Sequence, residues 1–135
     1  MNIEWNNKYL IGIEKIDNQH KQLVQQVNIF FNCVNKKKGR DKVLEILEYL
    51  SEYVEEHFKD EENLQKQIKY PDYEEHKNKH ENFKTLIIKL KDKIIKTDID
   101  YNNILETNQI ITKWIINHIY NSDKKIGEYI KKIKS

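Results

Sequence analysis

Helix-breaking residues are scarce in this chain, and their scarcity limits what it can fold into. The 135 residues include only one proline and three glycines, and the stretches between them carry apolar residues at helical spacing. Four such stretches follow one another along the chain. The sequence therefore predicts an all-α protein, an up-down-up-down antiparallel four-helix bundle with an N-terminal arm, formed by the first 16 residues, and a short C-terminal helix.

Local signals place the ends of the predicted helices. Asp17 and Asp41 are the predicted N-caps of the first and second helices. The pair 70–71, Tyr-Pro, ends the second helix because proline disfavours helical geometry in the residue before it. Asp72 and Glu75 then have the spacing of a capping box, which opens the third helix.

The C-terminal segment is basic and has Ile126, Ile130 and Ile133 at helical spacing. This pattern predicts an amphipathic helix. We expect the helix to dock on the protein's own core, and the alternatives are a membrane surface or a partner helix.

Length, charge and cysteine content exclude several classes of protein. A chain of 135 residues has the length of one domain, and no apolar run reaches the roughly 18 residues of a membrane span. The 24 basic and 22 acidic side chains are interleaved, which argues against nucleic-acid binding. The single cysteine, Cys33, excludes an internal disulfide and cysteine-rich metal sites, and we expect a buried, inert thiol. We therefore expect a cytoplasmic protein that contacts neither nucleic acid nor membrane.

The histidines lie where polar groups are costly. All five fall on the apolar faces of the predicted helices, whereas Lys77 and Lys79 fall off this face and should reach solvent. One such histidine is more often a hydrogen-bonded core residue, but five with a glutamate have no evident structural use. The inward candidates are His20, His57, Glu61, His76, His80 and His118.

This set of side chains predicts a metal centre. Imidazole and carboxylate ligands suit iron, zinc, manganese or copper. One tetrahedral zinc needs only four ligands, so two metal ions fit the number of inward groups better. A bundle without metal is the alternative, which the placement of the histidines disfavours.

The order and spacing of these residues resemble the ligand set of the hemerythrin family. The resemblance rests on His20, HFKDE at 57–61, HKNKH at 76–80 and HIYNSD at 118–123. The chain closely resembles the single-domain bacterial members, the bacteriohemerythrins. The resemblance extends over the whole chain and implies a single hemerythrin-like domain at 1–135.

The resemblance implies a non-haem diiron centre. One iron would be bound by His76, His80 and His118, and the other by His20 and His57. Both would be bridged by Glu61, by Asp123 and by a solvent-derived oxo or hydroxo group.

The resemblance is the only basis for including Asp123. This residue lies five positions after His118, about 140° around an ideal helix. A widened turn or π-bulge between the two residues would bring Asp123 inward. We therefore predict a helical irregularity in this stretch.

The implied function is reversible dioxygen binding. The ligand count leaves one vacant position, on the iron of His20 and His57, and the family resemblance implies that dioxygen binds there. Ile115 matches the position at which the family places a bulky aliphatic residue over the oxygen pocket, although ordinary core packing explains it equally well. Trp114, beside it, is expected to pack against a neighbouring helix.

We expect an oxygen carrier or storage protein and not an enzyme, because the inward face offers no spare acid or base. Two alternatives are an oxygen or redox sensor module that acts with a partner in trans, and a diiron oxidoreductase. A reductase or a signalling protein is a possible partner. The sequence leaves open the oligomeric state, the oxygen affinity and the acceptors for the outer N–H groups of the histidines.

Overall fold

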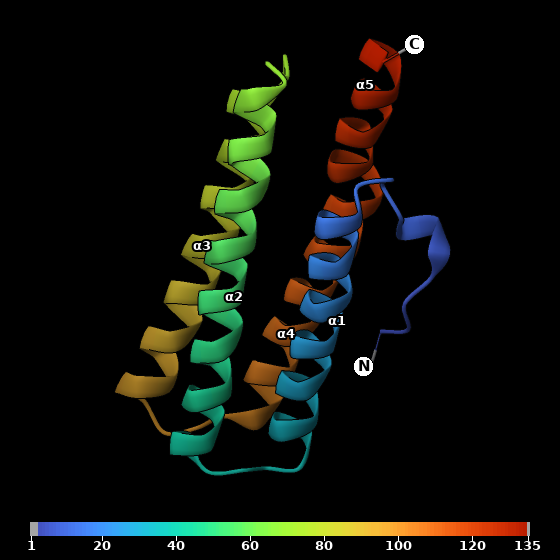
Figure 1. Ribbon diagram of the computed structural model, residues 1–135. Helices are drawn as coiled ribbons and strands as arrows, with labels where there is room; N and C mark the ends of the chain where they lie inside the picture. The colour runs from blue at the N-terminus through green and yellow to red at the C-terminus, as the bar shows by residue number, and fades with distance from the viewer. Residues whose placement is uncertain (1–2, 135) are drawn as a thin grey trace.

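Four long helices stand side by side in the computed structural model, which describes residues 3–134 (Figure 1). The chain runs up and down through α1 and α2, and then through α3 and α4, which lie behind them in the figure. Residues 3–134 contain no strand, so the predicted all-α bundle is confirmed. The helices are α1 (Glu14–Asn35), α2 (Arg40–Gln67), α3 (Tyr73–Lys96), α4 (Tyr101–Asn117) and α5 (Lys124–Lys134), with η1 (Asn7–Tyr9) in the arm and η2 (His118–Asp123) between α4 and α5.

Helix α1 begins earlier than predicted. Its first residue is Glu14 and its N-cap is Ile13, so the prediction of Asp17 as N-cap was wrong and the arm is shorter than 16 residues. Asp17 lies in the first turn, and its carboxylate accepts hydrogen bonds from the backbone N–H groups of Ile11 (2.8 Å) and Gly12 (3.2 Å). The carboxylate therefore ties the arm to the helix instead of capping it.

The other two predicted caps were partly wrong. Helix α2 begins at Arg40 with Gly39 as its N-cap, so Asp41 is not the N-cap. Asp41 lies in the first turn, where the helix dipole stabilises its negative charge. Asp72 does occupy the N-cap of α3, but its side chain makes no capping hydrogen bond. The position of the capping box was correct and its hydrogen bond was not.

The last turns of α2 bury different residues from those expected. The helical spacing of apolar residues in this stretch predicts that Leu64 and Ile68 face inward. Both are only half-buried, whereas Gln65 and Tyr70 are buried. Helix α2 ends at Gln67, and Lys69 takes a left-handed backbone conformation with φ 54°. The inward face thus continues in steps of four from Glu61 to Gln65 before the chain turns.

The arm and α5 pack against each other. The arm runs back along the outside of α1 (Figure 1), where Asn28 both accepts from the Ile3 N–H and donates to the Ile3 carbonyl, each at 2.8 Å. In α5, Gly127 allows close approach because a Cβ there would lie 2.0 Å from the Ile11 carbonyl oxygen. Ile126 is fully buried, which confirms that α5 docks on the protein itself, although Ile133 is exposed.

An apolar core fills the part of the bundle that lies beyond the histidines, at the end away from α5. Cys33 is buried in this core, as expected. Fully burying one such large side chain stabilises the fold by roughly 1.5–3 kcal/mol. Within residues 3–134, no helix is both long and apolar enough to cross a membrane. The largest buried apolar side chains include Phe30, Leu47, Leu50, Phe58, Phe83, Ile87, Ile111 and Ile115.

Candidate metal centre

The structure brings together all seven side chains that the sequence analysis selected. All five histidines are buried, with side chains that point into the bundle, which confirms their predicted inward placement. They are joined there by two fully buried carboxylates, and three helices and the η2 segment contribute to the cluster. The contributors are His20 from α1, His57 and Glu61 from α2, His76 and His80 from α3, and His118 and Asp123 from η2.

Three imidazoles converge on one point. The Nε2 atom of His118 lies 3.0 Å from that of His76 and 3.1 Å from that of His80. Two ligands at right angles around one metal ion would be about 3.0 Å apart if each bond were about 2.1 Å long, the length typical of an imidazole bound to zinc. The spacing of these nitrogens therefore fits three ligands of a single ion.

Two further imidazoles face the other side of the same carboxylates. The Nε2 atom of His20 lies 3.0 Å from Asp123 Oδ2 and 3.6 Å from Glu61 Oε2. The Nε2 atom of His57 lies 3.4 Å from Glu61 Oε2. These residues form a second group of potential ligands.

The two carboxylates divide their oxygens between the groups. Glu61 Oε1 lies 2.7 Å from His76 Nε2, whereas Oε2 faces His20 and His57. Asp123 Oδ1 lies 2.9 Å from His76 Nε2, whereas Oδ2 faces His20. Glu61 and Asp123 are accordingly common to both clusters of potential ligands, and within each cluster the donor atoms lie within 4.8 Å of one another.

Several nitrogen and oxygen atoms in the cluster that could bind a metal lack hydrogen-bond partners. Neither ring nitrogen of His20 makes a hydrogen bond, and Glu61 Oε2 and Asp123 Oδ1 make none although histidines lie near. Buried polar atoms are rarely left in this state without a water or an ion. Nitrogen and carboxylate donors in this arrangement fit transition-metal ions with mixed imidazole and oxygen ligation.

Without a metal, the cluster is held by shared protons. Although burial lowers the pKa of His20 and His76, the adjacent carboxylates of Asp123 and Glu61 raise the pKa of each to about 9. Although burial raises the pKa of Glu61, hydrogen bonds from histidines hold it well below its usual value. The pKa of His118 is lowered by burial. A bound cation would replace these protons.

The η2 segment explains how Asp123 reaches the cluster. It is a π-helix of six residues, His118–Asp123. Each turn is wider than in an α-helix, so residues five apart share a face. The predicted irregularity between His118 and Asp123 is confirmed, and the wider turn places the Asp123 carboxylate beside the imidazole of His118, with Oδ1 3.1 Å from Nε2.

Aromatic rings pack against two of the imidazoles. Phe58 lies flat on His80, with ring centroids 3.7 Å apart and planes 2° apart. Trp114 stacks on both His118 and Phe83, each at 4.3 Å, which confirms its expected packing against a neighbouring helix. Phe58 was missed in the sequence, where its place directly after a ligand histidine was the only signal. These rings hold the imidazoles in place and keep water from them.

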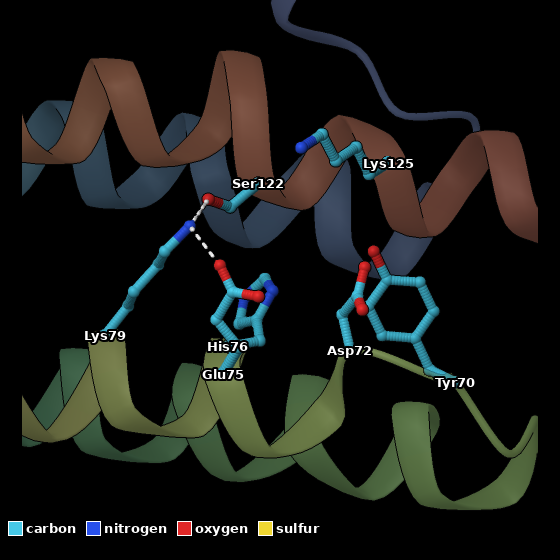
Figure 2. Close-up of a pocket in the computed structure, with 7 residues that line it drawn as sticks. All are labelled: Tyr70, Asp72, Glu75, His76, Lys79, Ser122 and Lys125. Atoms are coloured by element: carbon cyan, nitrogen blue, oxygen red, sulfur yellow. Dashed lines mark hydrogen bonds and ion pairs between the residues drawn. The ribbon is translucent and has the colours of Figure 1, made fainter.

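A small polar pocket of about 40 Å³ opens beside His76. Figure 2 shows Lys79 at this opening, where its ammonium donates to the Ser122 hydroxyl at 3.1 Å and lies 3.8 Å from Glu75. Lys79 reaches solvent as expected, with 43% of its side chain exposed, and it also contacts the residue before Asp123. The remaining lining residues are Tyr70, Asp72 and Lys125.

Two histidines have defined acceptors for their outer ring nitrogens. The Nδ1 atom of His57 lies 2.7 Å from Gln19 Oε1, and the Nδ1 atom of His80 lies 2.8 Å from Glu62 Oε2. Such acceptors fix the ring tautomer, because donation from Nδ1 leaves the Nε2 lone pair directed into the cluster. Neither acceptor was identified from the sequence.

The fold and the site together define an α-helical bundle protein with a buried histidine and carboxylate cluster able to hold metal between facing helices. The profile of the family described as the Hemerythrin HHE cation binding domain matches residues 11–130. The chain therefore belongs to the hemerythrin family.

Individual relatives agree with this assignment. The chain is 33% identical over 132 residues to a bacteriohemerythrin of Clostridium acetobutylicum, covering 93% of this chain and 97% of the relative. It is 29% identical over 122 residues to a myohemerythrin of Theromyzon tessulatum, covering 90% and 88% of the two chains. A crystal structure of wild-type hemerythrin has a TM-score of 0.84 at 24% identity, covers 95% and 97% of the two chains, and supports the fold.

Proposed function

We propose that this protein binds dioxygen reversibly at a non-haem diiron centre and acts as an oxygen carrier or store. The observation that carries the proposal is the division of carboxylate oxygens, in which Glu61 and Asp123 each face both groups of histidines. Such an arrangement suits two ions joined by two bridging carboxylates. Membership of the hemerythrin family supports iron as the metal.

The residues take the following proposed roles. One iron would be held by His76, His80 and His118, and the second by His20 and His57, and both groups would share Glu61 and Asp123. The irons, when bound, supply the electrons for reversible reduction of dioxygen. The second group has one imidazole fewer than the first, so the position for an external ligand belongs there.

An apolar wall beside the two-histidine group would keep this side of the centre dry. Ile115 is 1% exposed and lies one turn before His118, within the apolar core that contacts the cluster. We propose that it walls the oxygen pocket and excludes water and protons, which promote loss of electrons from a reactive centre.

The buried acidic side chains favour dioxygen binding without catalysis. The one other buried Asp or Glu in residues 3–134 is Asp17, which holds the arm. Substrate chemistry generally needs an acid or base free to transfer protons. The cytoplasmic location and the absence of nucleic-acid and membrane partners stay predictions.

Spectroscopy under changing gas tests the proposal. Iron-loaded, reduced protein should develop a visible absorption band on exposure to air and lose it again under argon through repeated cycles. A band that forms once and never reverses, or no band at all, would contradict oxygen carriage.

A further inference from the structure

His57 and His80 each donate from the outer ring nitrogen, Nδ1, and their acceptors differ in charge. His57, in the two-histidine group, donates from Nδ1 to the amide oxygen of Gln19 at 2.7 Å. His80, in the three-histidine group, donates from Nδ1 to a carboxylate oxygen of Glu62 at 2.8 Å. The acceptor is therefore neutral on one side of the cluster and anionic on the other.

The orientation of the Gln19 amide is determined by its other partner. Gln19 Nε2 donates to Asp60 Oδ2 at 2.8 Å, and a carboxylate can only accept. The amide oxygen must consequently face His57, whose Nδ1 must carry the hydrogen. Asp60 is itself paired with Lys15 at 3.6 Å, and Tyr53 donates to the Gln19 backbone carbonyl at 3.2 Å. The side-chain amide is thus held between Asp60 and His57, and the Gln19 backbone is held by Tyr53.

Glu62 places a carboxylate directly behind the His80 ring. Its Oε2 lies 2.8 Å from His80 Nδ1, and Lys84 and Lys77 are nearby charges. Its side chain is 14% exposed, and the other face of the His80 ring is covered by Phe58. Water therefore screens this charge only partly.

Charge behind an imidazole changes how well it donates to a metal. A carboxylate acceptor makes the ring more basic and stabilises the higher oxidation state, whereas an amide does so less. We propose that Gln19 keeps the two-histidine iron in the ferrous state until dioxygen arrives, while Glu62 lowers the reduction potential of the three-histidine iron. This inference rests on the proposed diiron function and makes Gln19 and Glu62 positioning residues that also set redox balance.

Two variants change the charge of the acceptor behind one histidine ring and keep a hydrogen-bond acceptor there. Glu62→Gln replaces the carboxylate behind His80 with an amide. The double variant Gln19→Glu with Asp60→Asn transfers a carboxylate from position 60 to position 19, keeps the net charge and preserves an amide donor. Asp60→Asn alone is the matched control, because it removes a charge without placing one directly behind His57.

The reduction potential of iron-loaded protein and its rate of oxidation in air are the two readouts. Glu62→Gln should raise the ferrous-to-ferric ratio at a fixed potential about tenfold, which is about 59 mV for a one-electron couple. The double variant should lower this ratio about tenfold and oxidise several times faster, and Asp60→Asn alone should not oxidise faster. Iron content and helical circular dichroism establish that each variant is folded and loaded.

A purely structural role would leave the potential unchanged, because both variants keep the rings hydrogen-bonded. Unchanged potentials, or shifts of the two variants in the same direction, overturn the inference. If the parent protein binds two irons and cycles with dioxygen while the variants show no shift, only this inference fails. If the parent protein does not hold two irons, the proposed function fails as well.

Discussion

Glu61 and Asp123 each turn one carboxylate oxygen toward His76 and the other toward His20. Glu61 Oε1 is 2.7 Å and Asp123 Oδ1 is 2.9 Å from His76 Nε2, while Asp123 Oδ2 is 3.0 Å from His20 Nε2. The two residues come from α2 and η2, which are separated along the chain by the whole of α3 and α4. The fold therefore joins two groups of histidines through shared carboxylates.

Replacing Glu61 with glutamine should disrupt both metal positions at once. The amide removes a negative charge shared by both ligand groups and offers only one oxygen. We expect fewer than two metal ions per chain, measured by elemental analysis after iron loading. Glu56→Gln, an exposed change on the same helix, should leave the metal content unaltered, and two ions in both variants would argue against a shared carboxylate.

Replacing Gly127 with alanine should destabilise the protein by about 1–3 kcal/mol, the usual cost of overpacking. The added Cβ would lie 2.0 Å from the Ile11 carbonyl oxygen, which belongs to backbone and must shift. Gly39→Ala has nothing within 4 Å of its Cβ and serves as the control. Urea unfolding of both variants measures the difference, and equal stabilities would mean that the arm does not pack on α5.

The metal-free protein should lose stability as the pH rises from about 6.5 to about 9. The pKa of His20 and His76 is about 9 in the folded chain, against 6.5 for an ordinary histidine. The folded state therefore binds more protons in this window, so raising the pH favours unfolding. Urea unfolding at pH 6 and pH 9 in the presence of chelator tests this, and His20→Gln should flatten the dependence. A stability that increases over this range would contradict the arrangement of charges.

Replacing Ile115 with alanine should speed oxidation of the iron-loaded protein in air. The smaller side chain opens a path for water toward the two-histidine group and also costs about 2–5 kcal/mol of stability. Ile111→Ala, one turn earlier on α4 and equally buried, should cost similar stability with a smaller effect on oxidation. Equal oxidation rates in these two variants would remove Ile115 from the oxygen pocket.

Helical periodicity was enough to predict the bundle and the inward faces of all five histidines. It failed where acidic residues occupy a first helical turn: Asp17 and Asp41 resemble N-caps in sequence but lie one to three residues inside their helices. Both positions favour a negative charge for the same reason, the unpaired N–H groups at a helix start.

Contacts between distant helices account for what the sequence did not reveal. Asp123 was out of reach of an α-helical period because its position depends on a π-helical turn, and only the family resemblance identified it. Gln19 and Glu62 could not be singled out among many polar neighbours, since their partners lie 38 and 18 residues away. The choice of acceptor depends on how α1 and α3 pack against α2.

The iron content of the purified protein is the most direct test of a diiron centre. Iron should be supplied anaerobically, unbound metal removed, and the iron-to-chain ratio measured for the parent protein and for His57→Ala. We expect two irons per chain in the parent protein and a loss of iron from the two-histidine group in the variant. One iron per chain in the parent protein, or zinc retained in place of iron, would contradict it.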